Sequence, residues 1–204
     1  EVTCGSELSA DDVRALSPDV VVLATGARPA RPPWAGDLER VVDVRDVLEG
    51  RVAPSGVVLV IDDLGFHQAT SVAEVLADRG CRVEVSTSGM VVGQDLGVTL
   101  DMETWNIKAA AKGIDQSTDL VVMGARPAQD GSGEVEVDRL HHPTGVTRTS
   151  SVDWVVCAGH QEPEDTLWHT LKGAPFGVHR IGDCITPRRA HAAVVEGERV
   201  AVAL

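Results

Sequence analysis

Short runs of β-branched residues alternate with amphipathic helical patterns, and this alternation is the feature that most constrains the fold. Residues 56–63 (GVVLVIDD) and 81–87 (CRVEVST) are two such apolar runs. Between them, residues 69–79 place apolar side chains three and four positions apart, as one face of a helix does. Apolar runs without polar alternation are typical of strands buried on both faces of a parallel sheet. The segment therefore predicts a strand–helix–strand unit with a right-handed crossover.

The same alternation extends over the rest of the sequence. Further strands are expected at residues 19–29, 119–124, 152–159 and 178–183, and further helices at residues 9–16, 44–50 and 99–112 and from about Pro187. Residues 133–140 and 144–151 alternate like an exposed hairpin. These patterns predict an α/β fold of two interleaved Rossmann-like units, each with three layers and mostly parallel sheets.

The chain is acidic, and this excludes several classes of function. Lys and Arg number 18 against 31 Asp and Glu, which gives a formal net charge of −13. Nucleic acids and anionic membranes attract basic surfaces, so neither is expected as a partner. No apolar run approaches the roughly 20 residues that a membrane-spanning helix needs, and no signal peptide opens the sequence. We therefore expect a soluble, cytoplasmic protein.

The four cysteines, Cys4, Cys81, Cys157 and Cys184, are widely separated along the chain. Zinc and iron–sulfur sites use closely spaced thiolates, often in a C-x-x-C pair, and the sequence contains no such pair. The spacing also gives no support to a disulfide framework. The cysteines are therefore predicted to be free and mostly buried thiols, and no metal site is predicted.

The turn after the first apolar run stands where dinucleotide-binding folds place a glycine-rich loop against a pyrophosphate. It contains Asp62, Asp63, Gly65 and His67, so carboxylates occupy the place of the expected phosphate. Two like charges about 4 Å apart repel by about 1 kcal/mol in water, and by more at a lower effective dielectric. The next strand ends at Thr87 without an acid to bind an adenosine ribose. We interpret the turn as a degenerate NAD-like site, and a working NAD(P)H site is the alternative.

A second candidate site follows the last expected strand. Gly182 has no side chain to block a ligand, and the Asp183 carboxylate can accept hydrogen bonds from a sugar hydroxyl. Pro187 can open a helix, whose N-terminus favours an anion. Arg188 and Arg189 would compensate the charge of a phosphate. The alternative is an ordinary strand–helix turn with two solvated arginines.

Two further turns end buried strands with small residues. One consists of Ala24, Thr25 and Gly26, and the other spans residues 157–159. Small residues let the backbone pack close to a ligand. Such turns are common, so each by itself is a weak indication of a site.

Taken in order, these motifs resemble the C-terminal region of the trimethylamine dehydrogenase and 2,4-dienoyl-CoA reductase family. Members are flavoproteins in which two nucleotide-binding folds follow an old-yellow-enzyme-like barrel. Residues 19–29 are similar to the strand that returns to the FAD or ADP site, residues 57–87 to an inserted NAD-like domain, and residues 164–204 to the closing segment. The Asp-Asp-Leu-Gly sequence of the degenerate turn is similar to the amine dehydrogenase branch.

The resemblance implies a division of the chain into three segments. Residues 1–52 and 161–204 would be the first and closing parts of an FAD- or ADP-binding fold. That fold would be incomplete, because its first G-x-G-x-x-G would precede Glu1. Residues 53–160 would be the inserted NAD-like Rossmann domain.

The resemblance also implies roles for individual residues. Thr25 and Gly26 would line the adenine-nucleotide site, and Gly182 and Asp183 its flavin or pyrophosphate end. FMN and a [4Fe-4S] cluster would be bound by the barrel, outside this chain. The implied partners are the rest of the same polypeptide, an electron-transfer flavoprotein and further copies in a homo-oligomer.

These observations predict a nucleotide-binding fragment of a flavin-dependent oxidoreductase. The amine dehydrogenase and NADH:flavin oxidoreductase types are the expected classes. The fragment would be inactive by itself, and no catalytic residue is predicted within it. The alternative is a non-catalytic nucleotide-binding or docking module with a degenerate dinucleotide site.

Overall fold

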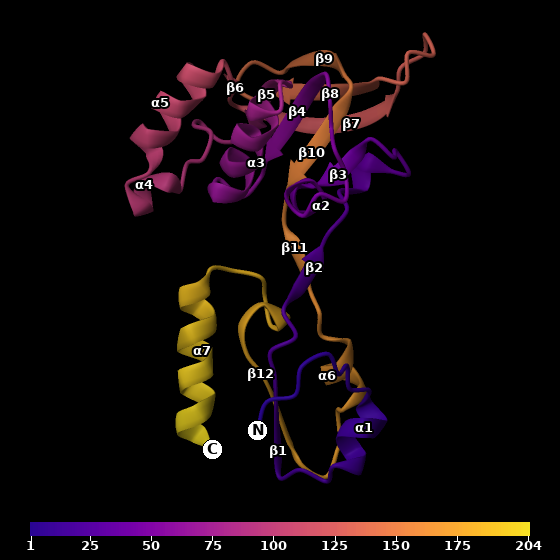
Figure 1. The fold of residues 1–204 in the computed structure, drawn as a ribbon, viewed down its shortest axis with the longest axis vertical. Coiled ribbons are helices and arrows are strands. Elements are labelled where there is room, and N and C mark those ends of the chain that lie inside the picture. The colour runs from indigo at the N-terminus through magenta and orange to yellow at the C-terminus, as the bar shows by residue number, and fades with distance from the viewer. The chain divides into compact units, whose positions relative to one another are not determined.

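The computed structural model describes residues 1–204 and divides them into two units (Figure 1). Unit 1 consists of Glu1–Ala30 and Gln161–Leu204, and unit 2 consists of Arg31–His160. The chain therefore leaves unit 1, forms all of unit 2 and then returns to complete unit 1. The predicted interleaving of two α/β units is confirmed.

Unit 2 is built on a five-stranded parallel sheet in the order β3-β10-β4-β5-β6. These strands are β3 (Val41–Asp43), β10 (Trp154–Ala158), β4 (Val57–Asp62), β5 (Arg82–Thr87) and β6 (Asp115–Ser117). The apolar runs form its three central strands, where Val58, Val60, Val85 and Val156 are fully buried. Burial on both faces removes the need for polar alternation, which is why these strands are continuous apolar runs in the sequence.

Helices cover one face of this sheet. They are α2 (Val44–Leu48), α3 (His67–Asp78) and α5 (Met102–Lys112), and a short helix α4 (Leu96–Thr99) precedes α5. Their buried side chains are mainly valine, alanine and leucine, with Trp105 as the one buried aromatic residue of the cluster. The single helix expected over residues 99–112 is therefore divided, because Leu100 adopts a left-handed conformation with φ of 63°.

An antiparallel sheet covers the other face and supplies the third layer of unit 2. Its strands are β7 (Leu120–Pro127), β8 (Val135–His141) and β9 (Val146–Val152), paired in that order. The predicted hairpin is the β8–β9 pair. Val135, Val137 and Val152 pack against Leu59 and Ile61 of β4 in a second core cluster that also includes the 3₁₀ helix η1 (Pro33–Ala35).

Residues 31–52 belong to unit 2, which corrects the boundary that we predicted after residue 52. Strand β3 pairs with β10, with Val41 opposite Val155. The Arg31 guanidinium also donates hydrogen bonds to three carbonyl groups between Gly36 and Val41, which folds the proline-rich segment onto its own unit. A three-residue strand behind three prolines gave too little apolar pattern to reveal this pairing.

Unit 1 contains two small sheets. The parallel pair is β1 (Val20–Leu23) with β12 (Gly177–Arg180), and the antiparallel pair is β2 (Ala27–Pro29) with β11 (Gln161–Pro163). Its other elements are α1 (Ala10–Ala15), α6 (Thr166–Thr170), the 3₁₀ helix η2 (Gly182–Cys184) and α7 (Ala190–Ala203). Helix α1 begins with the predicted capping box between Ser9 and Asp12. No helix in either unit has the length and apolar character needed to cross a membrane.

A buried ion pair joins the two sheets of unit 2. Arg139 on β8 is 4% exposed, and its guanidinium binds the carboxylate of Glu84 on β5 and the Ser150 hydroxyl. Ser117 also donates to Glu84, at 2.7 Å. Burial would raise the pKa of Glu84, but these hydrogen bonds and the positive charge of Arg139 outweigh it and lower the pKa.

We expect Arg139→Leu to lower the free energy of unfolding of unit 2 by about 1–3 kcal/mol, because it leaves the partly buried Glu84 carboxylate without the guanidinium that binds it. Glu84 titrates below its ordinary pKa of 4.5, so its stabilising contribution is present above that pH and is lost as the pH falls further. The difference in the free energy of unfolding between the wild type and Arg139→Leu should therefore become smaller in acid. Urea denaturation at pH 7 and pH 4 measures both effects. Arg148→Leu, at the exposed opposite position on β9, is the control and should change stability little.

Candidate functional site

The turns that follow β1 and β12 lie at the same edge of unit 1, because these strands are adjacent and parallel (Figure 1). Leu23 pairs with Arg180 at the ends of the two strands. The Leu23 carbonyl accepts a hydrogen bond from the Ile181 N–H at 2.9 Å and one from the Cys184 thiol at 3.1 Å. The structure therefore brings Ala24–Gly26 together with Gly182 and Asp183, two segments that the sequence singled out.

The turn at residues 24–26 is held by the segment that follows β11. The Thr25 hydroxyl donates to the Glu164 carbonyl, and the Glu164 N–H donates to the Gly26 carbonyl at 2.9 Å. Gly26 has φ of 77°, and no heavy atom lies within 4 Å of the position that a Cβ would occupy there. The backbone of this turn is therefore fixed, with open space beside it.

Gly182 occupies a position that only glycine fits well. Its φ of 68° lies in the left-handed region, and a Cβ there would lie 3.3 Å from the Cβ of Ala193 on α7. Its N–H donates to the Glu196 carboxylate at 2.7 Å. This backbone amide is already hydrogen-bonded and is not available to a phosphate.

Asp183 is half-buried and uses one of its carboxylate oxygens within the protein. Oδ1 accepts a hydrogen bond from the Arg188 N–H at 3.0 Å, and Oδ2 has no partner. Helix α7 begins a few residues later, and no side chain caps its N-terminus at Arg189. A carboxylate oxygen and an uncapped helix end are suited to a ligand with hydroxyl groups and an anionic group, respectively.

The two arginines are less available than the sequence suggests. The Arg188 guanidinium pairs with the carboxylate of Glu196 and also donates to the Thr186 carbonyl. Arg189 is the residue that precedes α7, with an extended backbone. The positive charge expected to compensate a phosphate is therefore partly neutralised by the protein itself. Sequence analysis missed Glu196 because its partners lie in a different element.

The degenerate turn in unit 2 is closed by one of its own side chains. Asp62 ends β4 and is 1% exposed. Its Oδ1 accepts from the Gly65 N–H and its Oδ2 from the Gly93 N–H, each at 2.8 Å. Burial raises the pKa of Asp62, and the two amide hydrogen bonds oppose that rise. Both oxygens accept a hydrogen bond, so the amides of Gly65 and Gly93 are already bound and cannot donate to a phosphate.

A cavity of about 230 Å³ lies at this turn. Its lining has three carboxylates and no basic side chain: Asp62, Asp63, Leu64, Gly65, Thr87, Ser88, Gly89, Gln94 and Asp95. Asp63 lies against Gly159, since a Cβ on that glycine would be 3.7 Å from its Oδ2. The His67 imidazole is paired with Asp101, with 3.3 Å between Nε2 and Oδ2. The cavity is therefore electrostatically unsuited to a pyrophosphate.

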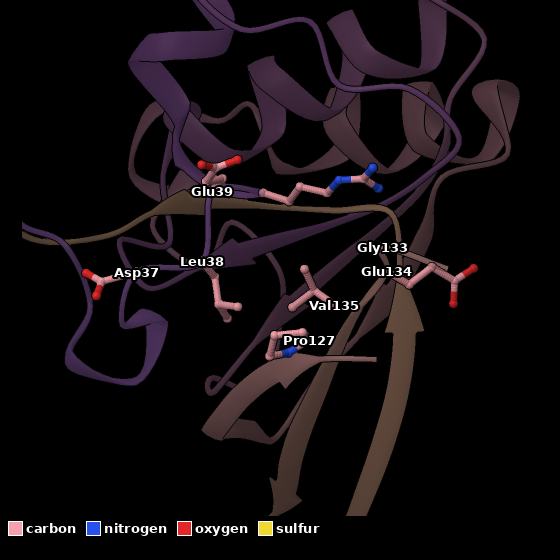
Figure 2. Close-up of a pocket in the computed structure, with 8 residues that line it drawn as sticks. Asp37, Leu38, Glu39, Pro127, Gly133, Glu134 and Val135 are labelled. Carbon is pink, nitrogen blue, oxygen red and sulfur yellow. The ribbon is translucent and has the colours of Figure 1, made fainter. Parts of the chain in front are cut away.

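A second cavity in unit 2, of about 360 Å³, lies between the segment before β3 and the β7–β8 connection. Figure 2 shows that its acidic side chains Asp37, Glu39 and Glu134 point away from one another rather than toward a common point. A binding site for a small molecule needs convergent polar groups, and these three carboxylates do not converge. No group of three or more His, Cys, Asp or Glu side chains is placed to hold a metal ion.

Comparison with known proteins identifies relatives that are much longer than this chain. No protein-family model matches it. It is 28% identical to the N,N-dimethylglycine/sarcosine dehydrogenase of Chromohalobacter salexigens, and the alignment covers 98% of this chain and 34% of that protein. It is also 28% identical to a probable N-methylproline demethylase of Rhizobium meliloti, covering 94% of this chain and 31% of that protein. The chain thus spans about a third of the length of these relatives.

A solved structure shares the fold. The 6-hydroxypseudooxynicotine amine oxidase of Pseudomonas geniculata superposes with a TM-score of 0.85 at 28% sequence identity. The superposition covers 95% of this chain and 30% of that protein. Both units are therefore represented in that larger structure.

We expect Gly182→Ala to destabilise unit 1 by about 1–2 kcal/mol, because an L-residue at this φ is strained and its Cβ would press on α7. Gly197→Ala on α7 is the matched control. It sits in a helix with ordinary contact distances, so the same change should stabilise by about 0.5–1 kcal/mol. Thermal denaturation of both variants measures the difference. Equal effects would show that neither the positive φ of Gly182 nor its closeness to α7 requires glycine.

Asp62→Ala removes the acceptor of two N–H groups, those of Gly65 and Gly93. We expect it to lower the free energy of unfolding of unit 2 by about 1–3 kcal/mol for each of them that is left buried without an acceptor. Asp63→Ala, at the adjacent exposed position, should change stability by less than about 0.5 kcal/mol. Chemical denaturation compares them. A small effect of Asp62→Ala would show that water replaces the carboxylate at both amides.

Proposed function

We propose that residues 1–204 are the nucleotide-binding part of a longer flavin-dependent oxidoreductase, because these relatives support the resemblance to the trimethylamine dehydrogenase and 2,4-dienoyl-CoA reductase flavoprotein family. The named relatives act on N-methylated amines and related amines, which supports an amine as the substrate class. The alignments cover about a third of each relative, so the substrate site would lie in the rest of the polypeptide.

The nucleotide held by unit 1 is FAD or ADP in this proposal. The observation that carries it is the meeting of two turns, Ala24–Gly26 and Gly182–Cys184, at the carboxyl ends of adjacent parallel strands. Ligands of open α/β sheets bind at this kind of edge. The open space beside Gly26, the unpartnered Oδ2 of Asp183 and the uncapped start of α7 fit such a ligand.

The two turns and the start of α7 would each make a different contact with the nucleotide. Asp183 accepts a hydrogen bond from a ribose or ribityl hydroxyl through Oδ2. The backbone at Thr25 and Gly26 approaches the nucleotide closely, and the N-terminus of α7 stabilises negative charge. Arg189 supplies further positive charge at that helix end. A bound flavin would supply the redox chemistry, and the protein would supply orientation and electrostatics.

Unit 2 keeps a dinucleotide-binding fold without binding a dinucleotide in this proposal. The self-hydrogen-bonded Asp62 and the acidic cavity beside it support this view. Electrons would then reach the flavin from the amine substrate rather than from NAD(P)H. FMN and a [4Fe-4S] cluster would be bound by the barrel of the same polypeptide. An electron-transfer flavoprotein as acceptor, a homo-oligomeric state and a cytoplasmic location complete the proposal.

The experiment that tests the nucleotide site uses the full-length polypeptide that carries this chain. We expect its absorption spectrum to show flavin, and mass spectrometry of the denatured protein to detect released FAD or ADP. Asp183→Ala should lower the affinity for ADP about tenfold, since it removes a charged hydrogen-bond acceptor. Asp11→Ala, exposed on α1, is the control and should bind ADP as the wild type does. A wild-type preparation that releases no nucleotide and binds no ADP would refute the proposal.

A non-catalytic docking module is the second candidate function. The closed Asp62 turn and the net charge of −13 favour it, because an acidic surface can meet a basic partner. It would be supported if the full-length protein bound a partner unaffected by Asp183→Ala and contained no nucleotide.

A further inference from the structure

Glu196 lies in the middle of α7 and reaches back to the turn that ends β12. Its Oε2 accepts the Gly182 N–H at 2.7 Å, and its Oε1 binds the Arg188 guanidinium. The side chain is 16% exposed, so these contacts are made largely out of solvent. One carboxylate therefore connects α7 to two points of the segment that leads into it.

These contacts also fix Asp183. Glu196 holds the residue before it, Gly182, and the side chain of Arg188, while the Arg188 N–H holds Oδ1 of Asp183. The four residues form a closed network that spans η2 and α7. Asp183 is left with one defined free oxygen, and the start of α7 is kept next to it.

The charge of Glu196 is stable at neutral pH. Burial would raise the pKa of Glu196, but the hydrogen bonds from Gly182 and Arg188 and the arginine charge outweigh it and lower the pKa. The carboxylate thus stays ionised and keeps both contacts. It also neutralises the charge of Arg188. A nucleotide bound here would therefore be recognised more by a hydrogen bond from its hydroxyl group to Asp183 than by the arginine charge.

We propose that Glu196 is a positioning residue of the nucleotide site: by reaching across the turn to hold the Gly182 N–H, with Arg188 bound to its second oxygen, it sets the free oxygen of Asp183 and the N-terminus of α7 in the geometry that binds the ligand. This inference rests on the proposed function, because it assigns a role within the same site. Glu196 does not touch the nucleotide in this arrangement. Its effect on binding depends on the reach of its side chain and on an acceptor oxygen, rather than on its charge alone.

Two substitutions separate reach from charge. Glu196→Gln keeps the chain length and an oxygen that can accept the Gly182 N–H, but it removes the charge and loses the Arg188 contact, because its NH₂ group cannot accept a hydrogen bond. Glu196→Asp keeps the charge but is one methylene shorter, so it cannot reach the Gly182 N–H while it binds Arg188. We expect the affinity of the nucleotide-free full-length protein for ADP to fall about tenfold in Glu196→Asp and to stay within about threefold of wild type in Glu196→Gln.

Controls keep the result specific to Glu196. Glu198→Asp makes the same change at an exposed position of α7 and should bind ADP as the wild type does. Thermal denaturation of each variant identifies a general loss of folding. If Glu196→Asp does not fold, the affinity of Glu196→Gln for ADP tests the inference. A tenfold loss of affinity in Glu196→Gln would assign the effect to charge and overturn the inference.

The outcomes also separate this inference from the proposed function. If the wild type binds no ADP, the proposed function fails. If the wild type binds ADP and Glu196→Asp binds it equally well or more tightly, only the positioning role fails. Weaker binding in Glu196→Asp with retention in Glu196→Gln supports both.

Discussion

Backbone N–H groups in the turns at the carboxyl edge of a parallel sheet have no partner in the strand ladder, and in this protein carboxylates supply the missing acceptors. Asp62 accepts from two such amides in unit 2, while Glu196 and Asp183 accept from one each in unit 1. A buried N–H without an acceptor is costly, so these contacts stabilise the fold. The same contacts decide where a ligand can bind, because an amide that is already hydrogen-bonded cannot hold a phosphate.

The two units use this interaction with opposite consequences. In unit 2 both oxygens of Asp62 are used and the adjoining cavity is acidic, so the turn is closed to anions. In unit 1 the Asp183 carboxylate keeps one free oxygen, and the nearby helix end has no cap. The two strand–turn–helix segments thus differ in the charges and free acceptors that they present, because a few acidic side chains lie at different positions.

Local pattern predicted most of the secondary structure, and long-range contacts account for what it missed. The buried strands, the capping box at Ser9 and the β8–β9 hairpin follow from patterns within a few residues. The membership of β3 in unit 2 depends on pairing with β10, which is more than 100 residues away in the chain. The candidate residues Gly182 and Asp183 were proposed from their residue types, but the contact between Glu196 and Gly182 exists only after α7 folds back. No local sequence pattern reports such a contact.

The β2–β11 ladder has a consequence for how such a protein tolerates change. Pro29 and Gln161 are opposite each other, so the entry and exit of unit 2 are already held side by side by unit 1. Closing a longer or shorter excursion between two fixed ends costs little additional entropy. Unit 1 can therefore accommodate exchange of the intervening domain for another with neighbouring termini.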